Sequence, residues 1–169
     1  MPAFVPLLGS KRHNTIIMHT QPSRFMQQLQ KHYPEHFFKK KVLEAAGDMR
    51  QYFSNCSYAV HHGIHVTPIH RLDMPAAFDV IVHTGTLHYD RNWINTLCAM
   101  YRNLKSGGAL IVTCAGPKSI LYEDDDAPLY YHPIGIDELA ALLPITVFTT
   151  YQIGYAAGTH ELEFFGVKK

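Results

Sequence analysis

Hydrophobic residues recur at helical spacing in two long stretches of the chain. The first stretch predicts a helix that opens at Pro22 and ends before Pro34. The second predicts the best helix of the chain, over residues 91–104, with Asp90 as its N-cap. Residues 1–21 show no clear period and hold two prolines, so we expect an irregular N-terminal arm.

Short runs of apolar and β-branched residues predict the strands. These runs cover residues 41–45, 56–60, 78–84, 109–114, 146–153 and 161–167. A short helix over residues 136–143 ends at Pro144, and Ser106, Gly107 and Gly108 are expected to turn the chain. Strands that alternate with helices predict an α/β fold with a Rossmann-like, mostly parallel sheet and helices on both faces. The last two strands predict a C-terminal antiparallel hairpin, and residues 22–169 form one domain.

Length and composition limit the classes of function that fit this chain. The 169 residues are 47% hydrophobic and 17% charged, which is typical of one globular domain. The net charge of +1 gives no general case for nucleic acid, and no apolar run is long enough to span a membrane. Three cysteines without paired spacing predict reduced thiols in the cytoplasm. The basic start of the chain would suit a protein partner or a phosphate-bearing substrate.

Histidine is over-represented, with twelve copies against 14 acidic residues. Six of them fall within 28 positions: His61, His62, His65, His70, His83 and His88. His61 or His62, His83 and His88 could lie near the carboxyl edge of the sheet with Cys114, and zinc accepts such ligands. No pair has the spacing of a known zinc site, so a metal centre is the weakest of the functional hypotheses.

A family resemblance rests on the order of several short motifs. FDVI at 78–81, LHY at 87–89, LKSGG at 104–108 and the apolar run at 109–113 follow one another as they do in class I S-adenosylmethionine-dependent methyltransferases, where FDVI opens the fourth strand. LEFFGVKK at 162–169 resembles the last strand of that family. The resemblance spans roughly residues 22–169 and implies a Rossmann-like fold with S-adenosylmethionine as cofactor.

The resemblance also implies a site at the carboxyl ends of the strands. Its expected cofactor contacts are Glu44, Gly47, His61, His62, Thr84 and Gly85. Its expected general bases are His88, Tyr89 and Asp90, just after the FDVI strand. No metal is part of this site.

Three departures from the family pattern weaken the cofactor site, and one of them is the loop after the FDVI strand, which reads Gly85-Thr86-Leu87-His88-Tyr89 where the family has acidic and histidine residues. The glycine-rich loop of the family is about half a dozen residues shorter here, with Gly47 alone remaining, and His61 and His62 stand where the family keeps an acidic ribose acceptor. Two functions therefore stay open. One is S-adenosylmethionine-dependent methyl transfer to a small-molecule or glycan acceptor. The other is a catalytically inactive methyltransferase-fold protein that acts as a structural or regulatory binding partner.

Overall fold

The computed structural model describes residues 14–61, 68–119 and 131–169. Within them, one sheet has the strand order β2-β1-β3-β4-β6-β5. The first four strands pair in parallel, and β6 is antiparallel to both of its neighbours. The bounds are β1 (Lys41–Ala46), β2 (Ser57–Val60), β3 (Phe78–Thr84), β4 (Leu104–Ala115), β5 (Phe148–Tyr155) and β6 (Glu161–Lys168). This confirms the predicted α/β sheet and its C-terminal antiparallel hairpin.

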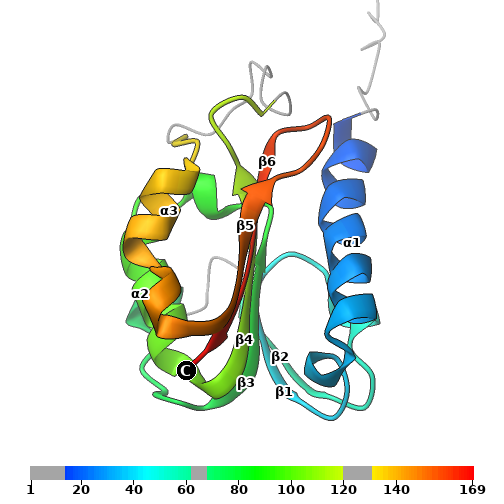
Figure 1. The fold of residues 1–169 in the computed structure, drawn as a ribbon, viewed down its shortest axis with the longest axis vertical. Coiled ribbons are helices and arrows are strands. Elements are labelled where there is room, and N and C mark those ends of the chain that lie inside the picture. The colour runs from blue at the N-terminus through cyan, green and yellow to red at the C-terminus, as the bar shows by residue number, and fades with distance from the viewer. Residues whose placement is uncertain (1–13, 62–67, 120–130) are drawn as a thin grey trace, which may run out of the picture.

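Helices cover both faces of this sheet, as predicted. Figure 1 shows α1 (Asn14–His32) on one face, with α2 (Trp93–Asn103) and α3 (Ile136–Leu142) on the other. The predicted start of the first helix was wrong, because α1 begins at Asn14 and Pro22 lies inside it. Proline lacks an N–H, so it costs the helix one backbone hydrogen bond without ending it here. Of the predicted arm, residues 14–21 are therefore helical, and residues 1–13 lie outside the described residues.

The core consists of two apolar layers, one on each face of the sheet. On the α1 face, Phe25, Met26 and Leu29 pack over strand residues such as Phe165. On the other face, helix α2 packs its apolar stripe onto β3 and β4. The central strands are buried on both faces, which explains why the sequences of β3 and β4 read as nearly continuous apolar runs. Each fully buried large side chain contributes about 1.5–3 kcal/mol to this packing.

Helix α2 begins at Trp93, two residues after the predicted start at residue 91, and its N-cap is Asn92. Asp90 nevertheless serves the helix start through its carboxylate. One carboxylate oxygen accepts a hydrogen bond from the Asn92 N–H at 2.7 Å, and the other accepts one from the Thr96 hydroxyl at 2.5 Å. The predicted N-cap was therefore wrong by two residues, and Asp90 supports the helix start through contacts from outside the N-cap position.

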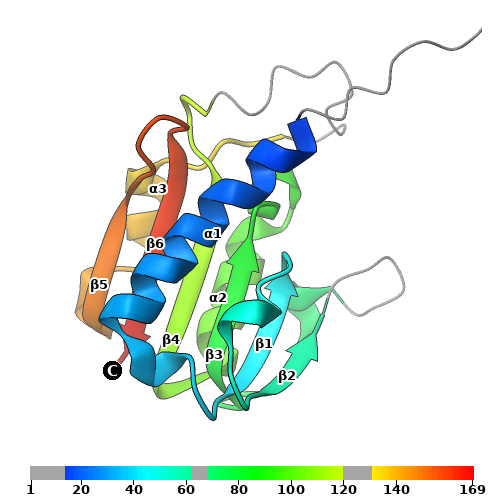
Figure 2. The same cartoon turned by 90° about the vertical axis from the view of Figure 1, so that its right-hand side faces the viewer.

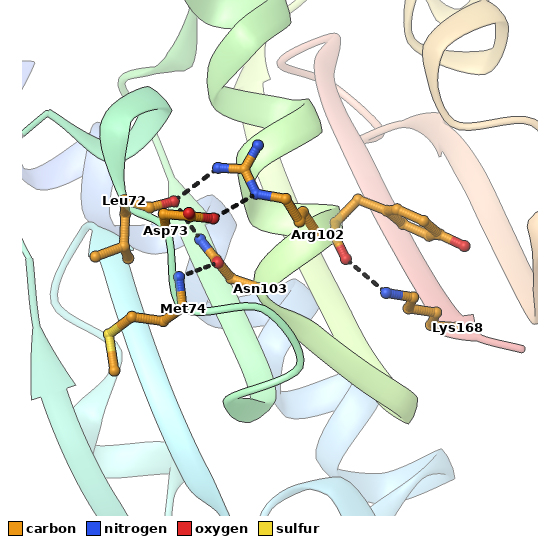
Figure 3. A network of polar contacts seen from close by, with 7 residues as sticks. Leu72, Asp73, Met74, Arg102, Asn103 and Lys168 are labelled. Atoms are coloured by element: carbon orange, nitrogen blue, oxygen red, sulfur yellow. Dashed lines mark hydrogen bonds and ion pairs between the residues drawn. The ribbon is translucent and has the colours of Figure 1, made fainter.

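The other end of α2 is tied to the segment that precedes β3. Figure 3 shows the buried Asn103 side chain between Leu72 and Met74: its amide donates to the Leu72 carbonyl at 2.9 Å, and its carbonyl accepts from the Met74 N–H at 2.8 Å. Arg102 donates to the same Leu72 carbonyl and pairs with Asp73 at 3.3 Å. These bonds hold the segment before β3 against the end of α2.

Strand β4 starts directly after α2, at Leu104, so the predicted turn at Ser106 to Gly108 was wrong. These residues form an irregularity inside the strand, where the partner of β3 jumps from Leu104 to Ala109. Gly107 adopts φ +74 there, a conformation that favours glycine.

The FDVI strand is the third strand here, whereas the resemblance places it fourth. Among the described residues, no strand lies between β2 and β3. The sheet therefore ends at the short strand β2, whose side chains are mostly exposed. No helix among the described residues is long and apolar enough to cross a membrane.

Candidate functional site

A cleft opens where β1 and β3 end side by side. It has a volume of about 260 Å³ and is lined by Pro22, Gly47, Asp48, Met49, Thr84, Gly85 and Thr86. Helix α1 contributes Pro22 as one wall, and the turns after the two parallel strands contribute the rest. This is the edge of a parallel sheet at which ligands bind in open α/β folds.

Gly47 and Gly85 keep the backbone of this cleft open. Gly47 adopts φ +111, and a Cβ on it would collide with the hydroxyl of Thr84. Gly85 adopts φ +77, and a Cβ there would meet nothing within 4 Å, so it faces open space. Thr84 itself is buried, and its hydroxyl donates to the Ala46 carbonyl at 3.4 Å. The register of β1 against β3 shifts between Glu44 and Ala46, and this irregularity sets the direction in which Gly47 leaves the strand.

Glu44 is turned into the protein and does not line the cleft. Its side chain is buried, and its carboxylate accepts hydrogen bonds from the Met49 N–H at 3.0 Å and from the Tyr58 hydroxyl. Burial and the contact with Glu44 raise the pKa of Tyr58 well above its usual value, so the phenol remains a donor. Glu44 therefore closes the turn after β1 by joining it to β2.

The turn after Gly47 is too short to present a helix to a ligand. It leads into a single 3-10 turn over Arg50–Tyr52. A long helix at this place would offer its N-terminal N–H groups to an anion, and a three-residue turn cannot do so. Asp48 is exposed at the rim of the cleft instead, and its carboxylate favours a cationic group there.

His61 directly follows β2, at the place where the family resemblance puts an acidic acceptor. The His61 N–H donates to the Glu44 carbonyl at 2.8 Å, which extends the β1–β2 pairing by one residue. The His61 side chain is half-buried, and His62 lies outside the described residues.

The three expected bases follow β3 but face different surroundings. His88 is fully buried, and its Nδ1 accepts a hydrogen bond from the Ala115 N–H at 3.0 Å. Its ring packs against Tyr89, with 4.1 Å between centroids, and against Tyr131, at 5.6 Å. Burial lowers the pKa of His88 to about 3, so its imidazole is neutral. Asp90 accepts hydrogen bonds at the start of α2. Of the three expected bases, Tyr89 is therefore the half-buried side chain that takes no part in that helix start.

His83 is the buried neighbour of this group. Burial lowers its pKa to about 4 against the opposing charge of Asp90, and its Nδ1 has no hydrogen-bond partner among the described residues. Within the described part of the chain, no group of three or more His, Cys, Asp or Glu side chains could hold a metal ion. His83, His88 and Cys114 thus form no such centre there.

Solved structures share this fold over nearly the whole chain. The N1-methyltransferase that acts on 1,6-didemethyltoxoflavin in Burkholderia thailandensis, solved with that compound and S-adenosylhomocysteine, has a TM-score of 0.60 and 18% identity, covering 99% of this chain and 94% of its own. S-adenosylmethionine-dependent methyltransferases from Thermotoga maritima (TM-score 0.58, 17% identity, 91% and 93% covered) and Archaeoglobus fulgidus (0.59, 10%, 93% and 100%) are similar. The chain has the class I methyltransferase fold. No protein-family model and no curated protein sequence matches it.

Within this methyltransferase fold, the structure brings Gly47, Thr84 and Gly85 together in one cleft, and it separates Glu44, His61 and His88 from that cleft. The cleft residues that the sequence did not indicate are Pro22, Asp48, Met49 and Thr86. Pro22 could not be found from spacing, because it reaches the cleft from a helix on the face of the sheet. Asp48 and Met49 directly follow Gly47, so their position beside the remaining glycine was the available signal.

Proposed function

We propose that this chain binds S-adenosylmethionine in the cleft between Gly47 and Thr86 and transfers a methyl group to a small-molecule or glycan acceptor. The observation that carries this proposal is the open floor at the ends of β1 and β3, where a side chain on Gly47 is sterically blocked and Gly85 faces open space. The exposed Asp48 carboxylate suits the cationic end of the cofactor. Bound there, the cofactor supplies the electrophilic methyl group.

The cleft fits only part of such a cofactor. Its volume of about 260 Å³ lies just under the range of roughly 300–1,000 Å³ that is usual for small-molecule sites. The 3-10 turn over Arg50–Tyr52 offers no helix N-terminus to the cofactor carboxylate. We therefore expect weaker binding than a long glycine-rich loop would give.

A second function is favoured by the contacts of Glu44. Its carboxylate is used inside the protein by Met49 and Tyr58, so it is held away from any ligand in the cleft. This arrangement supports an inactive methyltransferase-fold protein that acts as a structural or regulatory partner of another protein. Three free cysteines support a reducing compartment such as the cytoplasm for either function.

Calorimetric titration with S-adenosylhomocysteine tests the first proposal. We expect saturable binding to the wild type and none to Thr86→Trp, because an indole at this exposed cleft position fills the space above Gly47. Asn95→Trp, on the exposed surface of α2, is the matched control and should bind like the wild type. Asp48→Asn should weaken binding roughly tenfold, the effect of one charge-assisted hydrogen bond.

Absence of binding at millimolar ligand, with a folded wild-type protein, would overturn S-adenosylmethionine binding and leave the inactive protein as the function. Binding without transfer of a labelled methyl group to small-molecule or glycan extracts would favour the inactive protein as well. Transfer that is lost in Thr86→Trp and kept in Asn95→Trp would support the enzyme.

A further inference from the structure

Within the part of the chain that the structure describes, three buried polar atoms in β4, in β6 and in the turn before β6 have no hydrogen-bond partner: Thr113 Oγ1, Glu161 Oε2 and Thr159 Oγ1. Thr113 is 0% exposed, Thr159 6% and Glu161 2%. Buried polar atoms in native proteins are nearly always satisfied, because each one left without a partner is costly. Their concentration in one place therefore marks a position where hydrogen-bonding groups from outside the chain are expected.

Strand pairing puts Thr113 and the carboxylates on one face. Thr113 of β4 is opposite Glu163 of β6, and Ala115 is opposite Glu161. Residues opposite one another in an antiparallel pair point to the same face, and side chains alternate along a strand. Phe165, two positions after Glu163, stacks on Tyr33 next to α1 with 4.6 Å between ring centroids. Glu161, Glu163 and Thr113 therefore share the α1 face of the sheet.

The same face is open beside Glu163. Gly154 of β5 is its partner on the other side, and a Cβ on Gly154 would meet nothing within 4 Å. Figure 2 shows that α1 crosses the sheet beside the upper part of β6 and leaves β5 uncovered. A small group can therefore approach the half-buried Glu163 from the β5 edge, past Gly154, whereas Glu161 lies deeper on the same face.

The two carboxyl groups on this face favour a cation as the bound group. Burial raises the pKa of Glu161 to about 8, with the neighbouring Glu163 adding to the effect, and burial raises the pKa of Glu163 to about 7. Neither carboxylate forms an ion pair within the described residues. Carboxylates only accept hydrogen bonds when ionised, and an ammonium group only donates them, with three N–H groups on one nitrogen.

We propose that Glu161, Glu163 and Thr113 bind the ammonium group of an organic amine. A bound cation favours the ionised form of both carboxylates, which then supply the charge, and the Thr113 hydroxyl supplies a further acceptor. A divalent metal is a poorer occupant, since the described residues contain no group of three side chains able to ligate one.

The amine site and the cleft are connected by one row of paired strand residues. Thr84, which the cleft includes, is opposite Thr113, which is in turn opposite Glu163. The three residues form one row across β3, β4 and β6, so the amine site lies two strand spacings, about 10 Å, from Thr84. On the proposed methyl transfer, and resting on it, the bound amine is the class of acceptor. The ammonium group would first pass a proton to Glu161 or Glu163, whose raised pKa values suit them to hold it, because only the neutral amine has the lone pair that can form a bond to the methyl carbon. Binding of the amine itself does not depend on that function.

Carbon NMR of protein labelled at the glutamate carboxyl groups tests the site, with n-butylammonium chloride as the probe. Because an opposite charge favours the ionised carboxylate, the amine should lower the pKa values of Glu161 and Glu163 by about one unit. Equal concentrations of sodium chloride and of 1-butanol should leave both values unchanged. The carboxyl signal of the exposed Glu35, at the opposite end of the sheet, reports any non-specific effect in the same spectra.

Variants separate binding from a purely structural role. Glu163→Gln, at the less buried position, should abolish the amine effect on Glu161, whereas Asp137→Asn, an exposed residue of α3, should keep it. Glu161→Gln should likewise abolish the effect of the amine on the pKa of Glu163. If Glu161→Gln does not fold, the result with Glu163→Gln is sufficient to test the site. Equal responses to the amine and to sodium chloride, or a response that survives Glu163→Gln, would overturn the site.

Titration of the same samples with S-adenosylhomocysteine keeps the two proposals apart. Cofactor binding without an amine response would overturn the amine site alone. An amine response without cofactor binding would support the site and overturn its assignment as the acceptor site.

Discussion

Gly47 packs directly against Thr84, so closely that a single Cβ on Gly47 would overlap the threonine hydroxyl. The contact joins the turn after β1 to the end of β3. With Gly85, Gly47 lines the cleft with backbone and no side chain. The shape of the candidate site therefore depends on a packing contact between two neighbouring strands.

Replacement of Gly47 tests this contact. Gly47→Ala should lose about 3 kcal/mol of unfolding free energy, because an overlap is added to the strain of φ +111. Gly107→Ala is the control, since φ +74 also favours glycine while nothing lies within 4 Å of its Cβ, and it should lose only about 1–2 kcal/mol. Urea denaturation measures both, and equal losses would contradict the importance of Thr84. Thr84→Ala should restore part of the stability of Gly47→Ala.

Removal of the Tyr58 hydroxyl tests the closure of the β1 turn. Tyr58→Phe should cost about 1–3 kcal/mol, because the buried Glu44 carboxylate loses a donor. The raised pKa of Tyr58 has a second consequence at high pH. The folded state keeps the phenol proton that the unfolded state releases near pH 10, so this part of the stability is present below that pH and is lost as pH rises further. A smaller alkaline loss in Tyr58→Phe than in the wild type is the expected result of denaturation across this range.

Acid should destabilise the protein through His83 and His88. Their pKa values of about 4 and about 3 lie below the usual 6.5, so the unfolded state binds protons that the folded state refuses. Their contribution is complete above pH 6.5 and is lost as pH falls toward these values, at up to about 1.4 kcal/mol per pH unit for each group. Denaturation curves of His83→Asn should show a shallower loss between pH 6 and about 4. An unchanged slope of unfolding free energy against pH would mean that His83 is already charged in the folded protein or does not contribute to the loss of stability in acid.

Glu161 and Glu163 change the stability with pH in the direction opposite to that of the two histidines. Their raised pKa values mean that the folded state holds protons that the unfolded state has released, so this stability is present at low pH and is lost as pH rises toward about 8. Glu161→Gln should therefore flatten the decline above pH 6.5, where the two histidines no longer contribute. This measurement uses the same denaturation series and needs no ligand.

Asp90 provides a test of the start of α2. Asp90→Ala removes acceptors from the Asn92 N–H and the Thr96 hydroxyl and should cost about 1 kcal/mol. Asp90→Asn keeps one carbonyl acceptor and should cost less. Thermal unfolding followed by circular dichroism would show the order wild type, Asn, Ala; an Ala variant as stable as the wild type would contradict the capping role.

Elements with a clear period could be predicted from the sequence. Strand β3 has the predicted bounds because a continuous apolar run can only be buried on both faces of a sheet. The start of α1 could not be predicted in this way, because Pro22 is a strong local signal for a helix start and tertiary context overrides it. The turn at Gly107 was likewise a local interpretation, and the pairing of β4 with β3 decides that it is an irregularity in a strand.

The candidate site was predictable in position but only partly in composition. Gly47, Thr84 and Gly85 follow from the rule that ligands bind at the carboxyl ends of parallel strands. That Glu44 turns inward depends on Tyr58 of a neighbouring strand, which no spacing in β1 reveals. The pairing of Thr113 with Glu163 joins residues 50 positions apart in the sequence, and only the register of β4 against β6 brings them together.

The place of β6 between β4 and β5 also determines when the domain can form during synthesis. Residues 161–168 leave the ribosome after every other described strand, yet Phe165 is fully buried and its ring contacts Tyr33 and His36 from the first part of the chain. Until β6 emerges, β5 has no neighbour, and the apolar layer under α1 has no cover at its centre. Folding of this domain is therefore completed only after translation of these residues.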